Sequence, residues 1–333
     1  RYENEPYKFY FERGINRLRL VSLAEPMAIA AIKLRQVTPA PRYAEIAAGY
    51  DSLGYQPARD VFIKIQGEEA ILRSDASLFA VFDQGDPTVE PYHPAQIRLN
   101  SIGGHRWRQA GDWIAWEFEV PADGLYQIAI KAKQDLQRGA YSVRRVMMDG
   151  KVPFAELQNV EFPYSSRYRM VLLGDGQQPY LFYLTRGKHT LTLEVTLGRL
   201  APILKMTEES LYRLNTLYRQ IIMITSANPD PLRSYQLERR IPGLVDGLRE
   251  QAEMVATMAR DFEETTGERG GHTAVLRDLE RLLRQMADRP HVIPTLLEEY
   301  RDAIGSLGTW LITTREQPLQ IDYIIVSSPG QAL

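Results

Sequence analysis

The sequence predicts an α+β multidomain protein, in which an antiparallel jelly-roll β-sandwich carries an inserted antiparallel α-helical bundle and follows remnant strands of a preceding β-sandwich. Three observations predict this fold class. One hairpin pattern occurs twice, short alternating strands with Gly and Pro between them fill residues 61–200, and helical periodicity governs residues 201–315. Many short strands at regular spacing are typical of a β-sandwich, and helices joined by short loops are typical of a bundle.

The repeated hairpin lies at residues 6–21, PYKFYFERGINRLRLV, and at residues 179–194, PYLFYLTRGKHTLTLE. The two copies align without a gap, and eight of the sixteen positions are identical, including Arg13/Arg186 and Gly14/Gly187. Each copy reads as a strand, a turn at Gly and a second alternating strand, which is the pattern of a β-hairpin. We therefore expect one type of β-domain to be present twice.

The strand after each hairpin divides the chain into domains. EPMAIAAIKL (25–34) follows the first copy at once, whereas its counterpart QPLQIDYIIV (317–326) comes only after the helical region. A single apolar strand cannot bury both of its faces alone, so we expect it to pair with strands formed before residue 200. The predicted domains are the remnant strands of a first sandwich (1–37), a linker with a short helix (38–60), the sandwich (61–200 plus 316–328) and the inserted bundle (201–315). The earlier strands of the first sandwich are expected upstream of Arg1.

Within the sandwich, VFIKIQGEEAIL (61–72) is the expected first strand. Residues 111–133 read as two strands around a Pro-Ala-Asp-Gly turn, with Ile114, Trp116, Phe118 and Val120 on one face. Residues 142–154 turn at Asp149-Gly150. This alternation indicates strands with one face toward a core.

Four helices are predicted in the insertion, at residues 207–224, 232–266, 272–287 and 293–313. Thr207 is the expected cap of the first helix, and Pro242-Gly243 marks a break near the start of the long second one. The apolar stripe of these helices predicts a bundle core, with a partner-binding face as the alternative.

Composition excludes several classes of function. The net charge of −2 argues against a broad surface for nucleic acid, and no apolar run approaches the ~20 residues of a membrane span. Cysteine is absent, which removes thiol catalysis, disulfides and thiolate metal sites. The five histidines show no metal-ligand spacing, and no nucleophile elbow or phosphate-binding loop occurs, so we expect no enzyme.

Two resemblances follow from these stretches. GDWIAWEFEVPADGLYQIAIKAK resembles the strand–turn–strand signature of carbohydrate-binding modules of families 6 and 35, which are galactose-binding-like sandwiches. Over nearly its full length, through stretches such as YRQIIMITSANPDPLRSYQLE and LGTWLITTREQPLQIDYIIVSSPG, the chain resembles the amino-terminal region of extracellular solute-binding proteins of Gram-positive ABC transporters. This implies an extracellular, cell-surface protein, attached as a lipoprotein in its full-length form, with a carbohydrate or other small solute as ligand and a transporter permease as partner, and no membrane insertion by this segment.

The module resemblance also implies a structural calcium ion. In the resembled modules the opening Glu and the Asp of the closing strand help to hold it, and these positions are Glu68 and Asp322 here. Carboxylates from two distant parts of a chain suit a hard cation. The alternative is that Asp322 faces solvent or an arginine and that Glu68 is an ordinary strand-end charge.

Sugar binding requires aromatic rings flanked by polar groups. The candidate residues, all in or beside predicted loops, are Tyr92, Asn100, Arg106, Trp107, Trp113, Tyr164 and Tyr168. The alternative for each aromatic residue is packing against the helical insertion. The sequence thus predicts a non-catalytic extracellular module of a solute-binding protein for carbohydrate uptake. This module would bind glycan or position the solute-binding domain. The alternatives are a purely structural spacer without a ligand, or a glycan-active enzyme.

Overall fold

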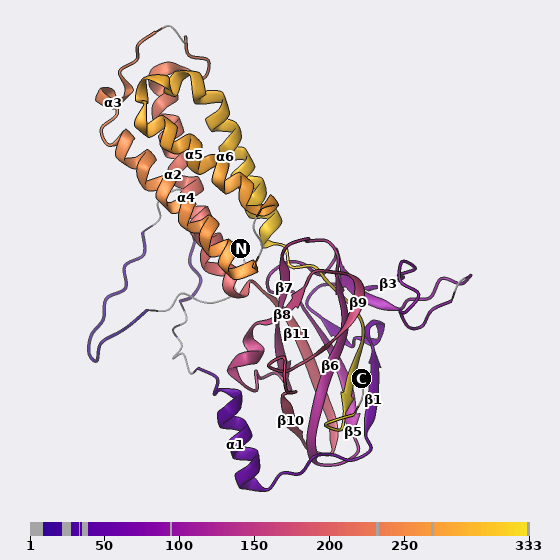
Figure 1. Cartoon of the computed structure of the whole chain (residues 1–333). Helices are drawn as coiled ribbons and strands as arrows, with labels where there is room; N and C mark the ends of the chain where they lie inside the picture. The colour runs from indigo at the N-terminus through magenta and orange to yellow at the C-terminus, as the bar shows by residue number, and fades with distance from the viewer. Residues whose placement is uncertain are drawn as a thin grey trace.

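The computed structural model describes residues 9–21, 28–32, 34, 39–93, 95–230, 233–267 and 270–331. A β-sandwich and a long helical bundle extending from one end of it make up the molecule (Figure 1). The α+β fold class predicted from the sequence, a sandwich of antiparallel strands with an inserted helical bundle, is confirmed.

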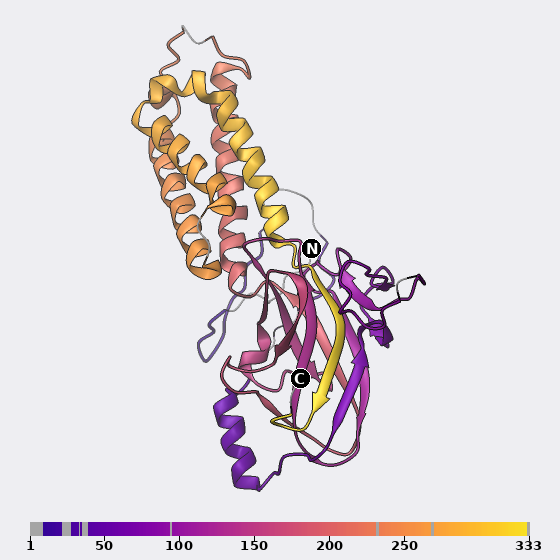
Figure 2. The ribbon, with the colours of Figure 1, turned by 45° about the vertical axis from the view of Figure 1, so that its right-hand side comes forward.

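The larger sheet of the sandwich has seven strands. In chain order they are β1 (Phe62–Gln66), β3 (Ala80–Val81), β4 (Ser101–Gly104), β6 (Gly124–Gln134), β9 (Ser165–Leu172), β10 (Leu181–Leu184) and β12 (Leu319–Ser327). Their order is β10-β6-β12-β4-β3, with β1 also paired to β12 and β9 to β6. β12 therefore lies inside the sheet rather than on the bundle, as Figure 2 shows for the yellow strand.

The smaller sheet has five strands, in the order β2-β5-β11-β7-β8. They are β2 (Leu72–Arg73), β5 (Trp113–Val120), β7 (Tyr141–Met148), β8 (Val160–Pro163) and β11 (Gly187–Thr196). The alternating residues that were assigned to one face of β5, among them Ile114, Trp116 and Phe118, are buried between the two sheets. Burial of such large side chains, at about 25 cal/mol per Å² of apolar surface, is the main stabilisation of the sandwich.

The linker contains one helix, α1 (Tyr43–Leu53), which ends at Gly54 in the left-handed conformation. Tyr43 fixes this helix to the sandwich, because its ring contacts Phe154 and Tyr180 at centroid distances of 4.9 and 4.6 Å. Short 3-10 helices connect other elements: η1 (Gly67–Glu69) follows β1, and η2 (Ala155–Gln158) precedes β8.

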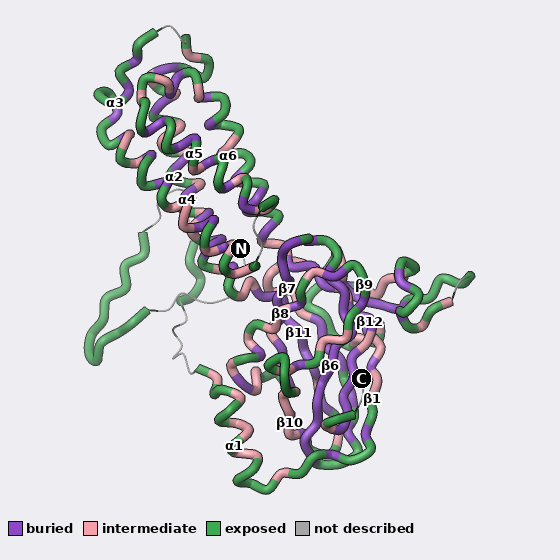
Figure 3. The backbone as a smooth tube through the Cα atoms, viewed as in Figure 1, coloured by how far each residue is buried: buried purple, intermediate pink, exposed green. Residues whose placement is uncertain are grey.

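Four long helices form the bundle: α2 (Ala201–Thr225), α4 (Leu244–Thr266), α5 (Gly271–Asp288) and α6 (Ile293–Arg315), with the one-turn α3 (Leu237–Arg240) and the 3-10 turns η3 (Gly198–Leu200) and η4 (Pro290–Val292) at their ends. Their apolar stripes pack into one core, visible as the buried interior in Figure 3. The break at Pro242-Gly243 is confirmed, since Gly243 precedes α4 with φ 75°. The predicted cap at Thr207 is wrong: α2 begins six residues earlier, and Thr207 lies inside it, donating to the Ile203 carbonyl at 2.8 Å.

The predicted remnant strands are not formed in the described part of residues 1–37. Residues 9–21 and 28–32 contain no strand, and all of them are exposed. Positions such as Pro6 and Pro26 lie outside the described residues. A hairpin that packs on no sheet is marginally stable at best, which explains the absence of a strand pair in the described segment.

Candidate functional site

An open trough lies on the outer face of the five-stranded sheet. It has a volume of about 500 Å³. Its lining residues are Leu72, Trp113, Ala115, Met147, Asp149, Gly150, Thr190 and Thr192. Trp113 is the only predicted sugar-binding residue among them, and we call this feature the Trp113 trough.

The strand register explains why the sheet is hollow here. Leu72, Ala115, Thr192 and Met147 lie side by side on β2, β5, β11 and β7, because each pairs with the next across the sheet. The two central positions carry small side chains, whereas the outer two carry long ones. Since alternate residues of a strand point to the same face, a small centre between larger flanks gives a groove with an apolar floor.

Charged pairs surround the Trp113 trough. Glu194 lies beside Trp113 in the register and accepts from Arg145 at 3.0 Å, and Glu117 accepts from Lys188 at 2.7 Å. Beyond them, the Asp149 carboxylate accepts the backbone N–H of Thr190 at 2.8 Å. The arrangement is an aromatic wall, an apolar floor and a polar rim, which is the composition of a small-molecule site.

His189 stands next to this rim with both ring nitrogens at acceptors. Nδ1 lies 2.8 Å from Asp149 Oδ2, and Nε2 lies 2.7 Å from the Thr185 carbonyl. Burial opposes the charged ring, but the hydrogen bonds to Thr185 and Asp149 outweigh it and raise the pKa of His189. The imidazolium form satisfies both acceptors at once.

Three of the predicted sugar-binding residues are wrong, because they are buried. Trp107 is fully buried, packs edge-on against Trp116 at a centroid distance of 6.5 Å, and donates from Nε1 to the Asp112 carbonyl at 3.2 Å. Asn100 is fully buried and bonds to both backbone groups of Asp83. Tyr168 is only 7% exposed, and its hydroxyl donates to Asp83 at 3.0 Å. A ring or amide without exposed surface cannot contact a glycan.

The other three candidates remain at the surface, away from the Trp113 trough. Tyr92 is 42% exposed, Tyr164 is half-buried, and the exposed Arg106 stacks over Phe79 at 4.0 Å from the ring centroid. None of them lines the trough. Of the seven candidates, Trp113 alone lines the trough.

Two buried lysines on the outer face of β6 fix the loop of residues 83–92 onto the seven-stranded sheet. Lys133 Nζ lies 2.7 Å from Asp83 Oδ2, and Lys131 Nζ lies 2.8 Å from Asp322 Oδ2. Lys131 also donates to the carbonyl of Thr88, and the backbone N–H of Glu90 donates to Asp322 at 3.0 Å. Asp322 thus faces a lysine, neither solvent nor an arginine as the alternative supposed.

The predicted calcium ligands do lie near one another, where η1 crosses β12. An added Cβ on Gly67 would lie 2.6 Å from the Ile321 carbonyl and 2.7 Å from that of Asp322, so the two segments are in close contact. Burial raises the pKa of Glu68 to about 7, and the charges of Glu69 and Asp322 add to this rise. Burial also raises the pKa of Asp322, although Lys131 opposes it.

Two buried side-chain oxygens in this region, Gln66 Oε1 and Glu68 Oε2, accept no hydrogen bond, whereas Asp322 Oδ2 is paired with Lys131 at 2.8 Å. Buried acceptors are normally satisfied, so such a group indicates a missing cation or donor. No cluster of three or more His, Cys, Asp or Glu is placed to hold a metal among the residues the structure describes. Side-chain and carbonyl oxygens are the ligands that a hard cation prefers.

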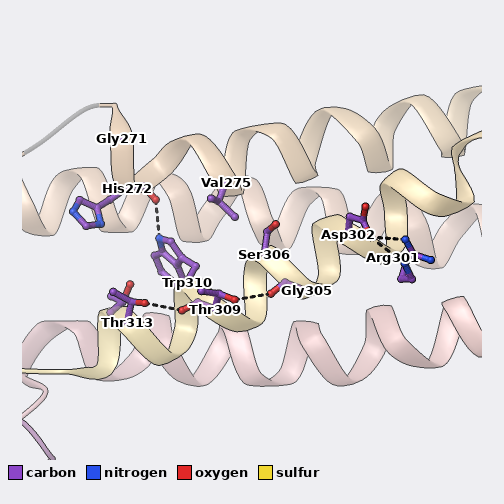
Figure 4. A pocket seen from close by; sticks show the side chains of 11 residues that line it. Gly271, His272, Val275, Arg301, Asp302, Gly305, Ser306, Thr309, Trp310 and Thr313 are labelled. Carbon is purple, nitrogen blue, oxygen red and sulfur yellow. Dashed lines mark hydrogen bonds and ion pairs between the residues drawn. The ribbon is translucent and has the colours of Figure 1, made fainter.

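A second, larger groove lies on the bundle between α5 and α6, with a volume of about 790 Å³. The small residues Gly305 and Ser306 of α6 line it, and Figure 4 shows them farther from the start of α5 than Trp310, which lies at that start. Trp310 beside it is buried and donates to the His272 carbonyl at 2.7 Å. Its largest aromatic side chain is therefore used for packing, and the groove offers no ring for a sugar to stack on.

A dense polar network joins the sandwich to the bundle. Gln137, in the loop between β6 and β7, donates from Nε2 to the carbonyls of Thr313 and Glu316 at 2.7 and 2.6 Å, and thereby caps the end of α6. The Gln317 side chain accepts the Val143 N–H at 3.0 Å, and Ser142 donates to the Pro318 carbonyl at 2.6 Å. The chain leaves the bundle without a free linker.

Comparison with known proteins gives one family match and several similar structures. Residues 202–314 match the model of the bacterial solute-binding protein 4-helix bundle domain, which confirms the resemblance of the helical part to solute-binding proteins. A search of curated proteins finds no match. None of the described helices has the length and apolar character that crossing a membrane requires.

The similar structures include carbohydrate-binding modules. The family 35 module from Clostridium thermocellum aligns with a TM-score of 0.30 and 12% identity over 41% of this chain and 87% of its own. The family 35 module from Paenibacillus barcinonensis aligns with a TM-score of 0.29 and 12% identity, over 40% of this chain and 88% of its own. A ruminal GH26 endo-β-1,4-mannanase aligns with a TM-score of 0.26 and 14% identity, over 40% of this chain and 22% of the enzyme.

Proposed function

We propose that the chain is a non-catalytic, extracellular module of an ABC-transporter solute-binding protein for carbohydrate uptake, and that its sandwich binds a glycan in the Trp113 trough. The observation that carries the glycan site is the combination of a half-exposed Trp113 with a small-residue floor and a charged rim. The family match of the bundle supports the solute-binding context.

The chemistry of the trough suits a sugar ring. The C–H face of a pyranose stacks on an indole, and Ala115 and Thr192 leave room for the ring to lie flat on the sheet. Hydroxyl groups of the sugar would bond to Thr190 and to the Asp149 carboxylate at the rim. Each hydroxyl both donates and accepts, so a rim with a threonine hydroxyl and a carboxylate can serve either role.

The rim charges support a non-catalytic role. Glycoside hydrolysis needs two carboxyl groups across a cleft, one of them free to act as an acid. Glu117, Glu194 and Asp149 are each already paired with a base, namely Lys188, Arg145 and His189. A paired carboxylate keeps its charge and is a poor proton donor.

The network at the junction supports a further role that we propose, in which the module positions the solute-binding domain near its permease. Because Gln137 and Gln317 bind the last carbonyls of α6, the bundle cannot swing freely on the sandwich. A lipoprotein anchor in the full-length protein would then set the height of the module above the membrane. If the chain bound no glycan, this spacer role would be the only one that remains.

Gln66, Glu68 and Asp322 are the residues that we propose to hold a structural calcium ion. The support is the unsatisfied buried oxygens of Gln66 and Glu68 beside the buried carboxylate of Asp322. Bound there, the ion would supply positive charge to Glu68 and Asp322 and join the opening of the sandwich to its closing strand. Lys131 would keep its ion pair with Asp322.

A glycan array probed with the purified chain tests the proposed ligand. The matched variant is Thr192→Arg, which fills the Trp113 trough from its floor without altering the core face of β11. We expect selective binding by the parent chain and its loss in the variant, with both chains giving the same circular dichroism spectrum. Binding that survives this substitution would place the glycan elsewhere.

A further inference from the structure

We propose that residues 9–21 are the closing hairpin of a second β-sandwich, equivalent to β10 and β11, and that they dock into a sandwich that lacks this hairpin. The proposal concerns a surface separate from the Trp113 trough and does not depend on glycan binding. It rests on the sequence repeat, on the shape of the turn and on the contrast in burial between the two copies.

The turns of the two hairpins have the same geometry. Gly14 and Gly187 both have φ of 129°, a conformation that favours glycine. Two residues later, the side chain in each copy reaches back to the carbonyl four positions earlier: Asn16 Nδ2 donates to Glu12 at 2.8 Å, and His189 Nε2 lies 2.7 Å from Thr185. Residues 9–21 thus keep the turn of a β-hairpin although no strand is formed among them.

Burial separates the copies. Phe182, Leu191 and Leu193 have at most 2% of their surface exposed, and they lie in the sandwich core. The residues at the same three positions of the repeat are Phe9, Leu18 and Leu20, which are identical in type and 60%, 42% and 57% exposed. Large apolar side chains gathered on one exposed segment indicate an interaction surface.

The sandwich of this chain cannot be the partner. Its β10 already pairs with β6, and its β11 lies between β5 and β7, so both positions are filled. The same holds for the sandwich of a second copy. The partner is therefore another sandwich of the same type, with open strands equivalent to β5, β6 and β7.

The register of the complete copy predicts the contacts of that docking. Leu193 pairs with Ile114 and Val146, and Phe182 pairs with Tyr126. Leu20 and Phe9 should meet aliphatic and aromatic side chains at the same places in the partner. A segment that adds as strands to open positions of a sheet gains backbone hydrogen bonds and side-chain pockets together.

A hairpin exchange within the 333-residue chain tests the inference. Residues 179–194 are replaced by the sequence of residues 6–21, and the control carries a scrambled version of the same sixteen residues. We expect the exchanged chain to unfold cooperatively, with a midpoint within about 10 °C of the parent, and the scrambled chain to lose the sandwich transition. Thermal melts followed by near-ultraviolet circular dichroism report the packing of Trp116.

One position of the hydrophobic core differs between the copies, since Phe11 takes the place of Leu184, which is 2% exposed. The copies also differ at the buried polar positions His189, Thr192 and Glu194. A second exchanged chain with Phe11→Leu removes this overpacking as a cause of failure. If both exchanged chains behave like the scrambled control, residues 9–21 are not a sandwich hairpin and the inference is wrong.

Discussion

The guanidinium of Arg144 donates to the carbonyl of Gln317 at 2.9 Å, and so joins β7 to the segment that leads from α6 into β12. It also donates to the carbonyls of Trp107 at 3.1 Å and Val143 at 2.9 Å, and its Cζ atom lies 4.1 Å from the centroid of the Trp107 ring. Burial lowers the pKa of Arg144 to about 9, with the charge of Asp112 opposing this change. A buried cation is thus retained where the inserted bundle returns to the sandwich.

Arg144→Ala should destabilise the sandwich by about 3 kcal/mol, because it removes the donor of three buried carbonyls and leaves a cavity beside Trp107. The neighbouring Arg145→Ala is the matched control, since Arg145 is half-buried and makes an ion pair at the trough rim; its cost should stay below about 1 kcal/mol. Urea unfolding measures both. Equal costs would mean that Arg144 does not fix the junction.

Gly67→Ala should cost about 1–3 kcal/mol, because the new Cβ would overlap the carbonyl oxygens of Ile321 and Asp322. Gly49→Ala in α1 is the control, since nothing lies within 4 Å of the added atom there. Differential scanning calorimetry compares the two. A harmless Gly67→Ala would show that η1 does not pack on β12 as described.

The His189–Asp149 pair predicts a pH dependence. Because the pKa of His189 is raised on folding, the pair stabilises the folded state fully below the pKa of unfolded histidine, and this contribution disappears as the pH rises through the higher folded value. His189→Gln should therefore cost about 1 kcal/mol more at pH 5.5 than at pH 8.5. His291→Gln, at an exposed position of the bundle, is the control. The same cost at both pH values would contradict the charged pair.

Calcium should raise the thermal midpoint of the chain. Since an ion that binds only the folded state stabilises it by about 2.7 kcal/mol at 100 times its dissociation constant, the shift should be several degrees, and a chelator should reverse it. Gln66→Ala and Glu68→Gln should each remove the shift, whereas Glu69→Gln, one residue further on, should keep it. An identical midpoint with calcium and with chelator rejects the proposed ion.

The sequence allowed the return of β12 to be predicted because the hairpin repeat exposed which strand was missing. It could not separate Arg144 from Arg145, since both sit in one alternating run and only the tertiary fold decides that one of them is buried. Trp107 was misassigned for a related reason: its flanking Gly and His residues suggest a loop, yet Arg144 and Trp116 enclose it. Gln66 is uncharged, so no charge pattern in the sequence indicated it as a cation ligand. Its role in the proposal comes only from the buried, unsatisfied amide oxygen in the structure.

The central claim, that a glycan binds in the Trp113 trough, is tested most directly by calorimetric titration with a glycan identified on the array. The parent chain, Trp113→Ala and Tyr92→Ala are compared, the last because Tyr92 is exposed but lies outside the trough. Loss of one stacking ring should weaken binding at least about tenfold, equivalent to ~1.4 kcal/mol, in Trp113→Ala only. Unchanged affinity in Trp113→Ala, or an equal loss in Tyr92→Ala, would contradict the account.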